Sequence, residues 1–430
     1  MYKREIPRNL LSLRVGMDAT TLFPSKGIEE SGPLEVRNPS IRLRTVYSDK
    51  DQSQVQTLVQ KIKSELRDVF RINIEEEIDS RVTGNILTEI GDLAREDAKR
   101  PQDHRPIYLV VTEKGSKDNP SAPYYKIKSE LLSNNILSQF VTTDTLNNQR
   151  RISSNTTFRN IALGIFVKAD NIPWHLQMPI TLNEQSEESL IIGIGITSVR
   201  HDIFSKETDR YVGYISFYNS RGVWKMMFPI LSPVDKIQEK IQQSLQEGIN
   251  YTISKEVNKL DVIIHYAGKD IQMEEEKAIT ETLTRYEKDT GFKINYAIVR
   301  LIKSAAYRLF SNRDNGYAPM GTYVNFENGL LLINTTGILG KNATPMGVNV
   351  PILASIKKTN LQSTPDLMHN IVYSVVGLAR INWRGVNAFN FEPATTKYAR
   401  EIAYIMAHLD QKIFKNQISL AFLQSKLWFI

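Results

Sequence analysis

The sequence has 430 residues, 41% of them hydrophobic, which allows two or three domains with their own cores and excludes a disordered chain. Lysine and arginine number 54 against 47 aspartate and glutamate residues, and the resulting net charge of +7 is compatible with a polyanionic partner. The absence of cysteine excludes disulfides, thiolate metal sites and cysteine nucleophiles.

No apolar run approaches the roughly 18 residues of a membrane span, and the first residues, MYKREIPRN, lack the apolar core of a signal peptide. We therefore expect a cytoplasmic protein that makes no membrane contact. Residues 1–37 carry repeated proline and glycine, which predicts an extended segment that packs on another domain.

Strands and helices alternate from residue 38 to residue 170. Strands are expected at Ile41–Thr45, Ile107–Thr112 and Ile136–Val141, and helices at Val55–Phe70, Ile86–Ala98, from Pro123 onwards and at Asn155–Ala169. This order predicts a parallel, doubly wound α/β domain. Ligands of such sheets bind beyond the carboxyl ends of the strands, where we expect the helix that carries Tyr124 to stand.

The stretch PYYKIKSELLSNNILSQ, residues 123–139, brings three polar groups together. Tyr124 and Lys128 share one helix face, and Gln139 follows at the start of a strand. A ring, an ammonium and an amide suit a terminal phosphate with a base stacked beside it. The alternative is a solvated lysine face with Tyr125 in the core.

The helix at Asn155–Ala169 adds Asn160 and Lys168, which are eight residues apart and so nearly in line after two turns. Either the two residues belong to the same phosphate site, or Lys168 only complements the dipole at the end of its helix.

The second half of the chain has the order of a ribonuclease H fold: three antiparallel strands, a helix, a strand, a helix and a strand. These elements are expected at Leu190–Thr197, Val212–Tyr218, Val223–Phe228, Asp235–Lys255, Asp261–Tyr266, Met273–Asp289 and Ile294–Ile302. A dinucleotide fingerprint at Gly193–Gly195 fails because Ser198 replaces the third glycine, and Gly340–Lys341 fails as a phosphate loop because Asn342 follows.

PYYKIK followed by SQF resembles the guide 5′-phosphate pocket in the MID domain of Argonaute proteins, specifically the compact prokaryotic and archaeal forms that lack a PAZ domain. The resemblance implies a Rossmann-like MID domain over residues 38–170 and a ribonuclease H-like PIWI domain over residues 171–430. It assigns the binding of the guide 5′-phosphate to Tyr124, Lys128, Gln139, Asn160 and Lys168.

Nucleases of this family carry metal-binding carboxylates at positions that here hold Gly195, Ala267 and Arg400. A glutamate on a mobile loop, the fourth ligand in the family, has no counterpart that we can place. Because Mg²⁺ needs oxygen ligands, the resemblance implies an inactive PIWI domain that is not an enzyme. The alternatives are an active guide-directed nuclease using Asp202 or Asp270, and an α/β enzyme with a nucleotide cofactor.

The chain closes with Leu427-Trp428-Phe429-Ile430, whose side chains would cost about 1.5 to 3 kcal/mol each to expose, so we expect a buried end. A buried carboxylate needs a cation. The resemblance implies that the terminal carboxylate of Ile430 and Gln139 hold Mg²⁺ or Mn²⁺ at the guide 5′-phosphate. The alternative is a hydrophobic tail that seals a domain interface.

The stretch Asn382-Trp383-Arg384-Gly385 also resembles the PIWI family, and we expect Arg384 and Lys397 to contact the duplex backbone. The family implies a short 5′-phosphorylated guide, expected to be RNA, a complementary target, expected to be DNA, and a role in prokaryotic defence against plasmids and phage. It also implies a heterodimer with a separately encoded protein. This partner would resemble the N-terminal lobe of larger Argonautes, or be APAZ-like, and would carry or recruit an effector.

Overall fold

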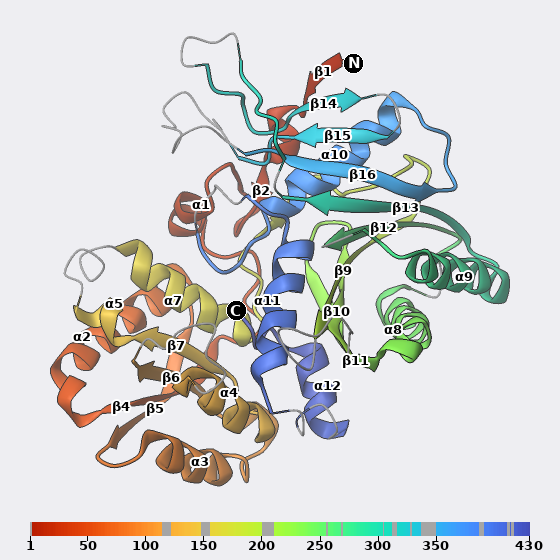
Figure 1. Cartoon of the computed structure of the whole chain (residues 1–430). Coiled ribbons are helices and arrows are strands. Elements are labelled where there is room, and N and C mark those ends of the chain that lie inside the picture. Colours follow the sequence, from red (N-terminus) through yellow and green to blue (C-terminus); the bar gives the residue numbers. More distant parts are fainter. Residues whose placement is uncertain are drawn as a thin grey trace. The chain divides into compact units, whose positions relative to one another are not determined.

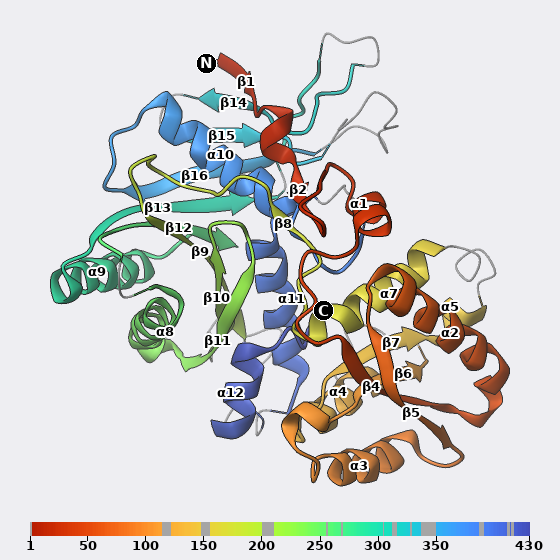
Figure 2. The same cartoon turned by 180° about the vertical axis from the view of Figure 1, so that it is seen from behind.

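The computed structural model describes the following residues (Figures 1 and 2): 2–113, 122–147, 155–199, 210–254, 257–267, 270–303, 305–311, 316–326, 329–336, 350–386, 391–410, 413 and 417–430. The chain divides into two compact units, which we name by their sheets. The large-sheet unit comprises Met1–Leu13, His175–Asn382 and Ala388–Ala407, and the small-sheet unit comprises Arg14–Trp174, Trp383–Asn387 and His408–Ile430.

The small sheet has four parallel strands in the order β5-β4-β6-β7. Their bounds are Ser40–Ser48 for β4, Asn73–Val82 for β5, Ile107–Thr112 for β6 and Ser138–Thr142 for β7. β5 was not among the expected strands, because its sequence contains few apolar residues. Its alternation of Ile with Glu and Asp is that of a half-exposed edge strand. The parallel sheet confirms the predicted fold class of this unit.

Helices cover both faces of the small sheet (Figure 1). α3 and α4 pack on one face, where Ile90, Ile127 and Val110 share a core, and α2 and α7 pack against each other on the opposite face. The helix bounds are Pro24–Ser31 for α1, Gln52–Ser64 for α2, Ile86–Asp97 for α3, Pro123–Ser133 for α4, Thr143–Asn147 for α5, Asn155–Lys168 for α7 and Gln417–Ser425 for α12.

Helix α1 corrects the expectation that residues 1–37 are extended. Pro24 occupies its first turn, where a missing N–H costs nothing, and Gly32 ends it with a φ of 79°. The proline and glycine that we expected to break a helix therefore delimit one. Short strands also form here, namely β1 at Tyr2–Glu5, β2 at Leu13–Arg14 and β3 at Thr20–Thr21.

The large sheet has nine strands in the order β1-β14-β15-β16-β13-β12-β9-β10-β11. The bounds are Glu188–Val199 for β9, Arg210–Asn219 for β10, Trp224–Pro233 for β11, Lys259–Ala267 for β12, Lys293–Ile302 for β13, Thr322–Phe326 for β14, Leu330–Ile333 for β15 and Ile352–Thr359 for β16; β8 is His175–Leu176. β9, β10 and β11 are antiparallel, and β12 lies parallel to both β9 and β13. This topology confirms the predicted ribonuclease H order.

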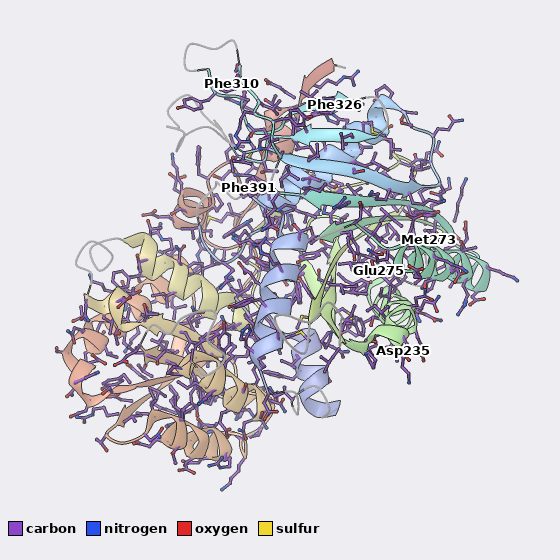
Figure 3. The ribbon with its side chains drawn as sticks, viewed as in Figure 1. Asp235, Met273, Glu275, Phe310, Phe326 and Phe391 are labelled. Atoms are coloured by element: carbon purple, nitrogen blue, oxygen red, sulfur yellow. The ribbon has the colours of Figure 1, made fainter. Side chains whose placement is uncertain are left out.

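Helices α8 (Ile237–Thr252) and α9 (Met273–Thr290) cover one face of the large sheet, and α10 (Pro365–Ala379) and α11 (Ala394–His408) cover the other (Figures 1 and 2). Figure 3 labels Glu275 in the first turn of α9, where its carboxylate accepts hydrogen bonds from the Gln272 N–H and the Tyr266 hydroxyl. Within the described residues, none of the helices combines the length and apolar composition that crossing a membrane requires.

The sequence of β9 shows why this layering forms. Leu190, Ile192 and Ile194 point into the core under α8 and α9, because alternate residues of a strand share a face. Gly193 and Gly195 point to the opposite face, where α11 approaches so closely that an added Cβ would lie 2.5 Å and 2.4 Å from its atoms. The glycines of LIIGIGIT therefore let α11 pack against the sheet.

Candidate functional site

Lys128 lies on the second turn of α4, and its side chain is buried with 2% exposure. Its ammonium donates hydrogen bonds to Ser138 Oγ at 3.1 Å and to the main-chain oxygen of Trp428 at 2.5 Å. The Trp428 ring is fully buried, which confirms the expectation of a buried tail. The alternative of a solvated lysine face is therefore wrong for Lys128.

Lys168 is the last residue of α7 and is 1% exposed. Its ammonium donates to Gln139 Oε1 at 2.8 Å and to the main-chain oxygen of Ile430. An added Cβ at Gly164 would lie 2.4 Å from that same Gln139 oxygen, so only glycine lets α7 pack this closely on β7. In Figure 1 the marked C-terminal end lies beside α7.

The two lysines reach the edge strand β7 from opposite faces of the small sheet. Consecutive side chains of a strand point to opposite faces, so Ser138 faces α4 and Gln139 faces α7. β7 is an edge strand with β6 as its neighbour in the described sheet, and the two ammonium groups contact the side chains of its first two residues. The pair thus lies beside the first residues of β7.

Burial acts strongly on both ammonium groups. It lowers the pKa of Lys128 to about 7, with a smaller contribution from the Arg384 guanidinium. Burial also lowers the pKa of Lys168 well below its ordinary value, and Lys128 and Arg384 add to this by repulsion. In the described part of the chain, neither ammonium group donates to an Asp or Glu side chain. The lowered pKa values reduce the positive charge of the free site, and an anion beside the two lysines would favour their charged forms.

Arg384 enters this site through Asn160. The Asn160 Oδ1 atom accepts a hydrogen bond from the Val386 N–H at 2.9 Å and lies against Gly385. Asn160 thus positions the exposed Arg384, which acts electrostatically on Lys128 and Lys168. Sequence spacing offers no signal for this arrangement, because Arg384 lies more than 200 residues beyond Lys168.

Tyr124 is half-buried, and its ring lies 4.7 Å from the Phe140 ring at an angle of 66°. Phe140 and Ser138 share a face of β7, so Tyr124 is on the same side of the sheet as Lys128. The neighbouring Tyr125 is buried and stacks on His408 at 4.7 Å. Tyr124, Lys128, Gln139 and Lys168 are therefore neighbours in space.

In the large-sheet unit, Gly195 on β9 and Ala267 on β12 are partners in the strand register. Ala399 of α11 packs onto Gly195, and Arg400 is the next residue. Gly195 and Ala267 are thus neighbours in the sheet, and Arg400 follows a residue that contacts Gly195. In place of carboxylates they present a hydrogen atom, a methyl group and a guanidinium.

Residues 108–411 match the model of the Piwi domain family. The chain belongs to the Piwi domain family. Similar solved structures include Drosophila Piwi, with a TM-score of 0.73 and 13% identity, where the match covers 100% of this chain and 56% of that one. Clostridium butyricum Argonaute, bound to a guide DNA and a 19-mer target DNA, gives a TM-score of 0.73 and 16% identity. The match covers 100% of this chain and 55% of that one.

Aquifex aeolicus Argonaute gives a TM-score of 0.62 and 18% identity over 92% of this chain and 54% of that one. The chain thus spans just over half the length of the solved structures that it matches. No curated protein matches it. At these identities the likeness establishes the fold.

The acidic residues near the Piwi sheet edge that the structure describes do not gather into a metal site. Asp270 accepts hydrogen bonds from Arg300 and Lys357, both at 2.7 Å, and these cations lower its pKa. Within the described ranges, no three His, Asp or Glu side chains are placed to hold a metal ion together. Asp202 lies outside the described residues.

Lys397 and Arg400 lie on α11 near a buried glutamate that sequence patterns gave no reason to select. Glu392 is 5% exposed and accepts two hydrogen bonds from Arg400 Nη1, at 2.7 and 2.9 Å. Burial raises the pKa of Glu392 to about 8, whereas the nearby Lys397 lowers it. Lys397, half-buried here, is thus part of a charged cluster on the Piwi fold.

Proposed function

We propose that this protein is a guide-dependent nucleic-acid-binding protein that holds a short guide by its 5′-phosphate and pairs it with a complementary target. The observation that carries the proposal is the pair of buried lysines, Lys128 and Lys168, beside the first residues of β7. A terminal phosphate brings nearly two negative charges at neutral pH and several acceptor oxygens, which two ammonium groups and Arg384 can neutralise.

The neighbouring side chains suit the rest of a 5′ nucleotide. Tyr124 offers a half-exposed ring for stacking on the first base, a contact worth about 1 to 3 kcal/mol. Asn160 holds the segment that carries Arg384, and we assign it to the same site. We assign Lys397 of α11 to the backbone of the guide–target duplex.

A divalent ion, Mg²⁺ or Mn²⁺, belongs to the proposal. The Lys168 ammonium already contacts Gln139 Oε1 and the main-chain oxygen of Ile430, so two oxygens converge on one cation. Oxygen ligands of this kind suit Mg²⁺, which takes its remaining ligands from water and phosphate. When bound, the ion would supply positive charge to the guide phosphates.

The proposal does not include cleavage. Gly195, Ala267 and Arg400 provide no oxygen to a metal ion, and Ala399 occupies the space that a side chain at position 195 would need. Hydrolysis of a phosphodiester in a ribonuclease H fold relies on two ions held by carboxylates. We therefore propose that target recognition is the output of this Piwi domain.

The proposal extends to the biological setting. We propose that the guide is RNA, that the target is DNA and that the protein acts in defence against invading DNA. We also propose that it forms a complex with a separate protein, which resembles the remaining half of the larger Argonautes and carries or recruits an effector. Sequencing of nucleic acid that copurifies with the protein tests the guide and target types. Coexpression with neighbouring gene products tests the partner, and full target binding by the chain alone would argue against one.

The central test compares guides that carry a 5′-phosphate with guides that carry a 5′-hydroxyl. Lys128→Gln and Lys168→Gln are expected to weaken binding of the phosphorylated guide at least tenfold more than binding of the hydroxyl guide. The reason is that only the phosphorylated guide carries the negative charge that the lysines contact. Lys126→Gln is the matched control, since Lys126 lies on the same helix and is exposed. Equal losses for both guides would overturn the assignment of the site.

A further inference from the structure

The carboxyl ends of three parallel Piwi strands meet at one edge of the large sheet. Gly195 of β9, Ala267 of β12 and Leu301 of β13 are aligned in the strand register. Lys303 follows directly after the last residue of β13, so its side chain starts at this edge. Open α/β sheets bind ligands at this edge, outside the carboxyl ends of their strands.

A cluster of three charged side chains forms here. Glu392 accepts hydrogen bonds from Arg400 at 2.7 and 2.9 Å, and its Oε2 atom lies 2.9 Å from the Lys303 ammonium. The side chains of Lys303 and Arg400 are 40% and 48% exposed, whereas that of Glu392 is 6% exposed. The carboxylate is therefore buried beneath two cations that face outwards.

The buried carboxylate holds both cations in place and leaves donors for a ligand. In the described structure, Arg400 uses only Nη1 for Glu392, so Nε and Nη2 stay available. Lys303 and Arg400 bring two positive charges against one negative charge, which leaves a net charge of +1. The two cations within 2.9 Å of the carboxylate favour its ionised form.

A hollow of about 470 Å³ adjoins the cluster, lined by Lys303, Ala305, Arg308, Val350 and Phe391. Phe391, labelled in Figure 3, precedes Glu392, and its main-chain oxygen accepts a hydrogen bond from the buried Thr335 hydroxyl. This bond fixes the segment that carries Glu392. Arg308 adds another positive charge to the rim of the hollow.

We propose that Lys303 and Arg400, positioned by Glu392, bind one phosphodiester of the guide–target duplex without a metal ion. A phosphodiester carries a single negative charge and matches the net charge of the cluster. The planar guanidinium donates two parallel hydrogen bonds to phosphate oxygens, and the ammonium adds a point charge. This inference rests on the proposed function, because it requires a duplex on the Piwi domain.

The first experiment measures target affinity of the guide-loaded protein as a function of salt. Each phosphate contact makes the slope of log K against log salt concentration steeper by about 0.9. At 0.1 M salt such a contact therefore contributes about eightfold in affinity, relative to about 1 M salt. Arg400→Gln and Lys303→Gln are each expected to lower the slope and the affinity by about these amounts. Lys277→Gln on α9 removes an exposed charge that is not part of the cluster, and it is expected to change neither.

The second experiment places single neutral methylphosphonate groups along the target strand and, separately, along the guide strand. At one or two neighbouring positions the substitution is expected to weaken binding to the unaltered protein about eightfold but to leave binding to Arg400→Gln unchanged. The strand that shows this coupling identifies the source of the phosphodiester. The double variant Glu392→Gln/Arg400→Gln leaves no buried carboxylate without its cation, and it is expected to lose the same coupling because the guanidinium is absent.

The outcomes separate the two proposals. If the protein binds no guide, the proposed function fails. If guide and target bind but no methylphosphonate position couples to Arg400, and the salt slope is unchanged in both single variants, the phosphodiester site is overturned while guide-dependent binding stands.

Discussion

The buried ammonium of Lys128 predicts that guide binding takes up a proton. Burial lowers the pKa of Lys128 to about 7 in the free protein, so the side chain is half charged at neutral pH. A 5′-phosphate beside it favours the charged form and returns the pKa to its ordinary value of about 10.4. Above pH 7 the free lysine is neutral and must gain a proton to bind the guide.

The magnitude follows from linkage. Affinity for the phosphorylated guide is expected to fall about 50-fold between pH 7 and pH 9, with a slope that approaches about tenfold per pH unit towards pH 9. The phosphate itself does not contribute in this range, because its second pKa is about 6. The lowered pKa of Lys168 acts in the same direction and can only steepen the dependence.

Fluorescence anisotropy with a labelled guide between pH 7 and pH 9 measures the effect, and calorimetry in buffers of different ionisation enthalpy counts the protons. The Lys128→Gln variant has no titrating group at this position, so it is expected to take up about one proton fewer when it binds the phosphorylated guide. The 5′-hydroxyl guide serves as the control. An affinity for the phosphorylated guide that does not change between pH 7 and pH 9 would refute the assignment of Lys128 to the phosphate.

Three further predictions concern stability and metal. Asp97→Ala leaves Arg44 buried without the carboxylate that it contacts at 2.7 and 3.0 Å, and is expected to lower the free energy of unfolding in urea by about 3 to 5 kcal/mol; a loss below 1 kcal/mol would contradict this. Gly195→Ala places a methyl group 2.4 Å from Ala399, which is expected to cost about 1 to 3 kcal/mol in thermal unfolding, whereas unchanged stability would show that α11 yields easily. Removal of Mg²⁺ and Mn²⁺ with EDTA is expected to weaken the phosphorylated guide and to leave the hydroxyl guide unaffected, and no change for either would exclude the ion at Gln139.

The order of the Piwi strands could be predicted from the sequence because it depends on local periodicity. LIIGIGIT places four apolar side chains on one face and two glycines on the other, and this alternation alone predicts a strand covered on both sides. The same reasoning missed β5, whose acidic residues reflect a half-exposed edge. It also missed α1, where proline and glycine occur at the two ends of a helix and not within it.

The phosphate site could be predicted only in part. Tyr124 and Lys128 belong to one helix, and Gln139 and Lys168 belong to elements whose spacing is regular, so their proximity could be anticipated. That both ammonium groups lie buried beside the first residues of β7 depends on Trp428 and on the close approach that Gly164 allows. Burial changes the chemistry of these lysines, and no local pattern measures it.

The sequence by itself determined the succession of elements, the helix that pairs Tyr124 with Lys128, and the lack of carboxylates at Gly195 and Ala267. These features follow from residue type and from spacing within one helix or strand. Only the tertiary structure brought Arg384 to the lysines and set Glu392 between Lys303 and Arg400. The physical reason is that electrostatic interactions act through distance in space, and segments tens or hundreds of residues apart become neighbours only when the sheets and helices pack.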